Sequence, residues 1–138
     1  MKGLGRVFNV VAAASGVHIP LKQGLAVTFV TYLDAGSQIA TLKQSVDGAS
    51  EAALSVKGYP HKAPGVGGTW TAMSDTEASS FDLADDATND CMVFTVGHEQ
   101  LDDGYNCVEV TVDGGICVAI IHDLLVQRKP ANLARNVV

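Results

Sequence analysis

Alternation with a period of two residues is the feature of this sequence that most limits its possible folds. Apolar and β-branched residues alternate with polar ones over Leu25–Leu33, Gln38–Val46 and Asn106–Val112. This is the period of a β-strand with one buried face, whereas an amphipathic helix repeats every 3.6 residues. No segment shows a helical pattern of convincing length. The chain is therefore predicted to be all-β.

Turn residues predict how the first strands are joined. Asp34–Ser37 separates Leu25–Leu33 from Gln38–Val46, and Asp47-Gly48 separates the latter from Ala52–Lys57. Asp-Gly between two alternating segments is a strong indication of a two-residue hairpin turn. The three segments are therefore predicted to form an antiparallel meander.

The C-terminal third shows the same organisation. Cys91–Val96 is a predicted strand, and Asp113–Gly115 separates the strand Asn106–Val112 from the strand Ile116–Ile121. The last two strands are predicted to pair as a hairpin with one strongly apolar face. The residues assigned to that face are Val108, Val110 and Val112 on one strand, and Ile116, Val118 and Ile120 on the other.

A length of 138 residues fits a single domain with a core of its own. A single sheet of about eight strands would leave its apolar face exposed to water. An antiparallel β-sandwich or a jelly-roll-like barrel is therefore expected. The β domain is assigned to residues 1–127, with residues 58–90, rich in Pro and Gly, as one long central loop-rich excursion. Residues 128–138 are predicted to form a basic C-terminal arm.

The charges are few and segregated. Charged residues make up 17% of the chain, below the usual ~25%. A surface covered by other subunits explains this, and so does an ordinary Ser/Thr/Gly-rich β surface. Residues 1–62 hold six bases and three acids, residues 63–127 hold twelve acids and no base, and residues 128–138 hold three bases and no acid. The acidic centre argues against nucleic acid as a partner, because phosphate contacts need cations.

The cysteines and the N-terminus indicate a protein made in the cytosol. Cys91, Cys107 and Cys117 match no zinc-binding spacing and are expected to be reduced core residues, with Cys107 and Cys117 able to face each other across two strands. Residues 1–16 imitate a signal peptide, but their apolar run is short and contains Asn9. No run is long enough to span a membrane.

No group of residues assembles a convincing active site. Neighbouring strand residues point to opposite faces, so His122 and Asp123 are not expected to pair as a base and its orienting carboxylate. No Gly-x-Ser-x-Gly occurs. Gly65–Thr69 is rich in Gly but lacks the Lys of a phosphate-binding loop. We therefore expect a non-enzymatic protein without a cofactor.

One acidic cluster was considered as a cation site. Asp82, Asp85, Asp86 and Asp90 fall close together in a polar loop, and carboxylates of this kind can bind Ca²⁺. Their spacing departs from the EF-hand pattern. A solvated acidic loop is the favoured interpretation, and no metal site is predicted.

The C-terminal third contains two distinctive motifs: Leu101–Tyr105, an acidic turn of the form LD-x-GY before a strand, and Asp123–Leu133, which reads DLLVQRKPANL. With these motifs, the C-terminal third resembles small virion structural proteins of tailed bacteriophages. The resemblance implies a β-rich protein of the virion, most plausibly one that decorates or stabilises the head. It implies no catalytic residues, because the group is not enzymatic.

The resemblance also implies partners. The expected partners are the major capsid protein and further copies of this chain, commonly as a trimer at local three-fold positions, with no nucleic acid and no membrane. The expected location is the capsid surface of the virion, after synthesis in the host cytoplasm. A tail or head–tail connector protein is the alternative within this class.

Two alternatives come from other classes. In a carbohydrate-binding or host-attachment module, Trp70, Tyr59, Tyr32 and Tyr105 could stack on sugar rings. A hydrolase would need His98 or His122 to meet a Ser, a Cys or a carboxylate in a pocket.

The C-terminal arm supplies the predicted partner-binding residues. Pro130 has no backbone N–H and is expected to end the sheet ladder, so residues 131–138 can leave the domain. Basic side chains of the arm can then pair with carboxylates of a neighbouring subunit. A solvated terminus is the alternative. The residues assigned to partner binding are Arg128, Lys129, Pro130, Asn132, Leu133 and Arg135.

Overall fold

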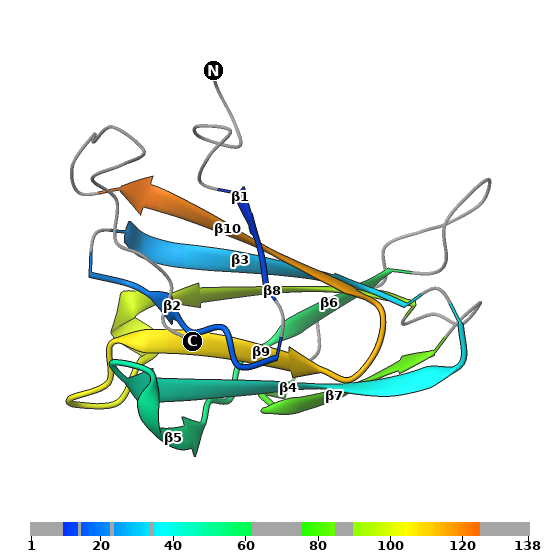
Figure 1. Cartoon of the computed structure of the whole chain (residues 1–138), viewed down its shortest axis with the longest axis horizontal. Coiled ribbons are helices and arrows are strands. Elements are labelled where there is room, and N and C mark those ends of the chain that lie inside the picture. Colours follow the sequence, from blue (N-terminus) through cyan, green and yellow to red (C-terminus); the bar gives the residue numbers. More distant parts are fainter. Residues whose placement is uncertain are drawn as a thin grey trace.

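The computed structural model describes residues 10–13, 15–22, 24–33, 35–61, 76–84 and 90–124. Almost all of these residues belong to strands and the turns between them (Figure 1). The described strands are β1 (Val10–Ala12), β2 (Ile19–Pro20), β3 (Gly24–Tyr32), β4 (Ser37–Val46), β5 (Ala49–Ala53), β6 (Gly58–His61), β7 (Ser80–Ala84), β8 (Cys91–Gly97), β9 (Cys107–Val112) and β10 (Ile116–Leu124), and a 3₁₀ turn, η2 (His98–Gln100), follows β8.

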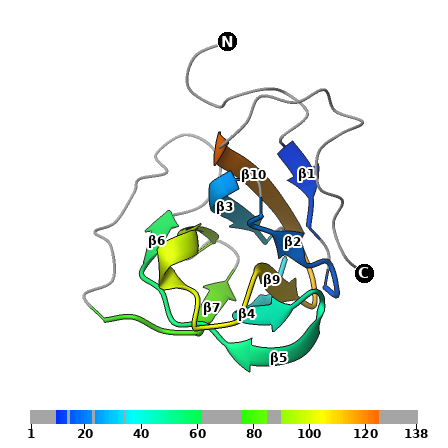
Figure 2. The same cartoon turned by 90° about the vertical axis from the view of Figure 1, so that its left-hand side faces the viewer.

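The strands form two antiparallel sheets that pack face to face (Figures 1 and 2). The first sheet has the order β1-β10-β3-β8-β6. The second has the order β2-β9-β4-β5, and β7 also pairs with β4, beside β5. The described strands do not close into a barrel, so the prediction of an antiparallel β-sandwich is confirmed and the jelly-roll-like barrel is not what forms.

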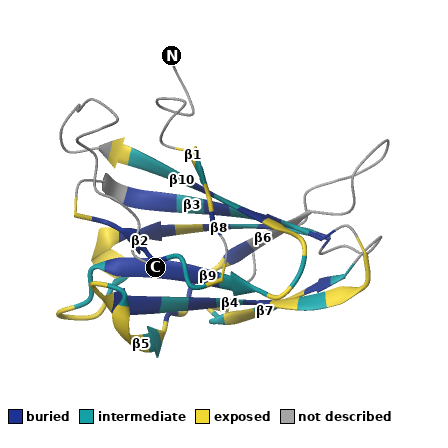
Figure 3. Cartoon of the chain, in the orientation of Figure 1, coloured by how far each residue is buried: buried dark blue, intermediate teal, exposed yellow. Residues whose placement is uncertain are grey.

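The core lies between the sheets. Phe29 of β3 pairs in register with Phe94 of β8, and both rings are fully buried. The ring of Phe81, on β7, lies 4.8 Å from that of Phe94, which joins the two sheets. Figure 3 shows buried residues along the strands of both sheets, with β5 and the turns exposed. Further fully buried residues of the core are Ile19, Val27, Leu42, Val56, Leu83, Val96 and Val108.

One polar side chain of β4, that of Gln44, is also buried, and the turn before β9 supplies its hydrogen-bond partners. Gln44 is 1% exposed, on the core side of β4. Its amide nitrogen donates to the carboxylate of Asp102, and its amide oxygen accepts from the Asp102 backbone N–H at 2.9 Å. A buried amide without partners would cost about 1–3 kcal/mol. The acidic turn Leu101–Tyr105 therefore has a structural role in this fold.

The hairpin predicted at Asp47-Gly48 is confirmed. Asp47 and Gly48 have φ values of 50° and 82°, as a type I′ turn requires. The turn joins β4 to β5, which pair directly. The strand after this turn runs from Ala49 to Ala53, earlier than the predicted Ala52–Lys57.

Two other predicted pairings are wrong. β3 and β4 lie in different sheets, and so do β9 and β10. Each short connection therefore carries the chain from one sheet across to the other instead of forming a hairpin. Strand alternation assigns faces within one strand, but it does not decide whether a turn pairs its two strands or separates them.

Ile116, Val118 and Ile120 of the last strand share one face, as predicted, but that face is not continuous with Val108 and Val110 of β9. Cys117 and Ala119 of β10 are buried in the core, whereas Ile116 is 60% exposed and Val118 and Ile120 are half-buried on the other side. β-branched residues suit either face of a sheet, so their pattern alone did not identify the core side. On β9 the prediction is right, since Val108 and Val110 face the core.

The predicted excursion over residues 58–90 contains more regular structure than expected. β6 and β7 lie within it, and Val56 forms an isolated bridge with Ala78. The strand predicted around Trp70, and Trp70 itself, lie outside the described residues.

Candidate functional site

The side of the first sheet that points away from the core carries an apolar surface, here called the outer face. Register brings its side chains into rows across four strands. One row joins Ala12, Val118, Val30 and Val93. The outer face consists of Val10, Ala12, Thr28, Val30, Tyr32, Cys91, Val93, Thr95, Ile116, Val118, Ile120 and His122.

None of these residues of the outer face is an acid, a Lys or an Arg, although the Asp123 carboxylate borders the face beside His122. Ile116 and Val10 are 60% and 39% exposed. With strands about 4.8 Å apart and about 3.3 Å per residue, the face covers roughly 400 Å². Apolar patches of about 300–600 Å² are the largest on typical monomers and are often functional. The outer face is therefore the candidate functional site.

The outer side of the second sheet is different in kind. Ile39 is 54% exposed there, but Asp82 of β7 is its register partner. Further along, the ammonium of Lys43 donates to the Glu51 carboxylate at 2.7 Å. This hydrogen bond from the Lys43 ammonium holds the pKa of Glu51 below its usual range. Charge thus distinguishes the two outer sides of the sandwich.

The outer face ends in a chain of hydrogen-bonded polar groups. Thr28 Oγ1 lies 2.9 Å from His122 Nε2, and His122 Nδ1 lies 2.9 Å from Asp123 Oδ2. The sequence prediction that His122 and Asp123 cannot pair is therefore wrong. Asp123 has a φ of 53°, which interrupts strand alternation and returns its carboxylate to the side of His122.

A hydroxyl, an imidazole and a carboxylate in this order match the order of a nucleophilic triad. Such a triad also needs N–H donors aimed at a developing oxyanion. Thr28 lies on a strand paired on both sides, opposite Ile120 and Thr95, so the nearby backbone N–H groups face the sheet ladders. The two depressions described below do not include Thr28, His122 or Asp123 among their lining residues. The other candidate, His98, lies exposed in η2.

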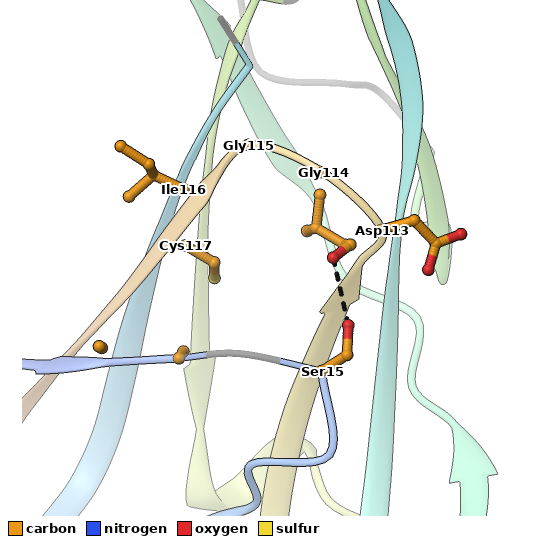
Figure 4. Close-up of a pocket in the computed structure, with 9 residues that line it drawn as sticks. Ser15, Asp113, Gly114, Gly115, Ile116 and Cys117 are labelled. Carbon is orange, nitrogen blue, oxygen red and sulfur yellow. Dashed lines mark hydrogen bonds between the residues drawn. The ribbon is translucent and has the colours of Figure 1, made fainter.

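One depression of about 310 Å³ opens beside the connection between β9 and β10 (Figure 4). Ser15 closes one side, where its hydroxyl donates to the Val112 carbonyl at 3.2 Å. Burial raises the pKa of the Cys117 thiol at its wall to about 12, which makes this thiol a poor nucleophile. The lining residues are Ala12, Ala13, Ser15, Val112, Asp113, Gly114, Gly115, Ile116 and Cys117. A second depression, of about 570 Å³, involves Gln38, Ile39 and Asp82.

The three cysteines are free thiols, as the sequence predicted. Cys107 and Cys117 do not lie across a hairpin from each other, because β9 and β10 belong to different sheets and do not pair. Both are buried, whereas Cys91 lies half-buried on the outer face and is not a core residue. Burial raises the pKa of Cys91 and of Cys107 as well.

We therefore expect one thiol to dominate the reactivity of the folded protein. At pH 8 a chromogenic disulfide reagent should label Cys91 slowly, leave Cys107 and Cys117 unlabelled, and label all three after unfolding in guanidinium. Cys91→Ser should remove the labelling of the folded state. Labelling of two thiols at similar rates in the folded wild type would contradict the burial of Cys107 and Cys117.

The residues predicted for partner binding lie outside the described residues. These are Arg128, Lys129, Pro130, Asn132, Leu133 and Arg135. The acidic cluster is described only in part, with Asp82 exposed on β7 and Asp90 buried before β8. Of the aromatic residues considered for sugar binding, Tyr32 and Tyr105 are half-buried, while Trp70 lies outside the described residues. Sequence reasoning placed Ile116, Val118 and Ile120 on one apolar face, but it joined that face to Val108 and Val110 of β9 and so missed the outer face.

Comparisons with known proteins add no relative. No family model matches the chain, and no curated protein or solved structure matches it either. Within the described ranges, no helix has the length and apolar character needed to cross a membrane.

Proposed function

We propose that this chain is a non-enzymatic structural protein of a phage particle that decorates the head by docking on the major capsid protein. The observation that carries the proposal is the outer face, an apolar surface over four strands with no described Lys or Arg and with one described carboxylate, that of Asp123, at its end. Charge depletion with apolar and aromatic residues is typical of the centre of a protein–protein interface. The triad-like group at its end is open and has no described donors for an oxyanion, which favours binding over catalysis.

The size of the outer face indicates that docking needs a second contact. A standard interface buries about 800 Å² on each partner, roughly twice the area estimated for the face. The basic segment 128–138 is the proposed second contact, through Arg128, Lys129 and Arg135 and the carboxylates of a neighbouring subunit. Neighbouring copies of this chain offer such carboxylates in residues 63–127.

The mechanism of stabilisation is mass action. A protein that binds the assembled lattice but not its separated subunits raises the free energy needed to open the lattice. No bond is made or broken in this function, and the chain has only to present a rigid apolar surface. A sandwich with a packed core suits this role, because the backbone of pre-organised surfaces usually moves little on binding.

The experiment that tests this function measures copy number in purified particles by quantitative mass spectrometry. A decoration protein should be present in hundreds of copies, in fixed ratio to the major capsid protein. The number of copies in a single ring would assign the chain to the tail or the head–tail connector. Absence from particles would overturn the proposal.

A matched pair of substitutions tests the surface. Ile116→Lys should weaken binding to undecorated particles by at least about a hundredfold, since an unpaired charge buried at an interface costs about 3–5 kcal/mol. Ile39→Lys is the control, because it changes an isoleucine of similar exposure, 54% against 60%, on the other sheet. Sedimentation with particles measures both. Equal binding of the two variants would exclude the outer face as the docking surface.

A further inference from the structure

Three side chains that are far apart in the sequence meet on the outer side of the second sheet. His18 precedes β2, Glu51 lies on β5 and Glu109 lies on β9. His18 Nε2 is 3.6 Å from Glu51 Oε1 and 3.9 Å from Glu109 Oε2, and one ligand atom of each residue lies within 4.8 Å of the others. His18 and Glu109 are only 4% and 2% exposed, whereas Glu51 is open to solvent.

The ring of His18 is held in a fixed orientation. Its Nδ1 lies 2.9 Å from the hydroxyl oxygen of Ser45, which is itself buried. When Nδ1–H donates to this oxygen, the neutral ring directs the lone pair of Nε2 at the two carboxylates. Histidines that bind metals are oriented by a hydrogen bond at the other ring nitrogen in the same way.

Glu109 has one oxygen that its surroundings satisfy and one that they do not. Oε1 accepts from the backbone N–H of Gly16 and from the hydroxyl of Thr111 at 3.2 Å. Oε2 is buried and has no hydrogen-bond partner among the described residues. A buried carboxylate oxygen without a partner is costly, and this one points to the space between His18 and Glu51.

We propose that His18, Glu51 and Glu109 form a binding site for a Zn²⁺ ion, with solvent as the fourth ligand. Zn²⁺ accepts imidazole nitrogen and carboxylate oxygen at about 2.0–2.2 Å, so tetrahedral ligands lie about 3.3 Å apart. The separations of 3.6 Å and 3.9 Å from His18 Nε2 need only a small contraction. Three ligands that include a nitrogen do not suit Ca²⁺ or Mg²⁺, which prefer six or more oxygens.

The ammonium of Lys43, which lies beside the cluster, leaves room for the metal. Lys43 binds Oε2 of Glu51 at 2.7 Å and leaves Oε1 directed at His18. The bound ion would connect the segment before β2 to β9 and β5, and so cross the second sheet. This role is independent of the docking proposed above, since it concerns the opposite side of the sandwich.

Calorimetric titration of the tag-free chain, first treated with a chelator, tests the proposal. Addition of ZnCl₂ should show one site per chain and raise Tm, and CaCl₂ at the same concentration should do neither. Glu51→Gln and Glu109→Gln should each weaken zinc binding by at least about tenfold, since even loss of an outer hydrogen-bond partner costs about 10–100-fold. Glu77→Gln is the matched control, because it makes the same change of charge at an exposed residue outside the cluster.

Each outcome decides the proposal. Weaker binding in both glutamate variants, with unchanged binding in Glu77→Gln, supports it. Because Glu51 is exposed, Glu51→Gln should fold even where Glu109→Gln does not. The absence of zinc binding, or equal binding by Glu51→Gln and wild type, would overturn it. Ile116→Lys should bind zinc like wild type, so failure of docking and failure of zinc binding are distinguishable.

Discussion

Phe94→Ala is expected to lower the free energy of unfolding by about 3–5 kcal/mol, which is the usual cost of removing a buried aromatic ring. Phe94 is fully buried, lies opposite Phe29 in register and packs against the ring of Phe81. Its ring also approaches the backbone of β6, since a Cβ on Gly58 would lie 3.1 Å from it. Removal of the ring therefore leaves a cavity bordered by both sheets.

Urea denaturation followed by circular dichroism measures the effect. A domain of this size is stable by about 5–15 kcal/mol, so the variant should unfold at a much lower urea concentration. Val93→Ala is the control, because Val93 is the next residue of the same strand and lies half-buried on the outer face. Val93→Ala should lower the free energy of unfolding by less than half as much as Phe94→Ala does. Equal losses would mean that Phe94 does not occupy the centre of the sandwich.

The sequence predicted the strands better than the way they pair. Alternation and turn residues located β3, β4, β8, β9 and β10 to within a few residues. Alternation depends on local backbone geometry, which is why it is visible in one sequence. The choice between a hairpin and a crossing from one sheet to the other depends on the tertiary position of both strands. Asp47-Gly48 correctly predicted a hairpin, because both residues adopt the left-handed conformation of a type I′ turn. Asp113–Gly115 did not distinguish a hairpin from a crossing between the sheets.

The candidate sites were harder to predict for related reasons. The outer face uses Val118 and Ile120, which look like core residues in the sequence. The cluster of His18, Glu51 and Glu109 brings together β5, β9 and the residue before β2. These residues are far apart in the sequence, so no short motif predicts the cluster. The contact between His122 and Asp123 depends on a single positive φ. Each of these features is a property of the tertiary arrangement, which periodicity does not specify.

Gly115→Ala is expected to disturb the crossing from β9 to β10 and to destabilise the fold by about 2–5 kcal/mol. Gly115 has a φ of 84°, where an L-residue costs about 1–2 kcal/mol. A Cβ at this position would also lie 2.3 Å from the backbone oxygen of Tyr32. Backbone cannot rotate away as a side chain can, so the connection must shift, at a further cost of about 1–3 kcal/mol.

Gly104→Ala separates the two contributions. Gly104 has a φ of 91°, but a Cβ there would meet nothing within 4 Å, so only the backbone term of about 1–2 kcal/mol applies. Chemical denaturation of both variants should therefore rank Gly115→Ala as the more damaging. Because the next residue, Ile116, pairs with Tyr32 and belongs to the outer face, Gly115→Ala should also weaken docking on particles, whereas Gly104→Ala should not. Equal destabilisation by the two variants would show that the Tyr32 carbonyl does not limit the space at Gly115, and that the crossing is wider than the structure describes.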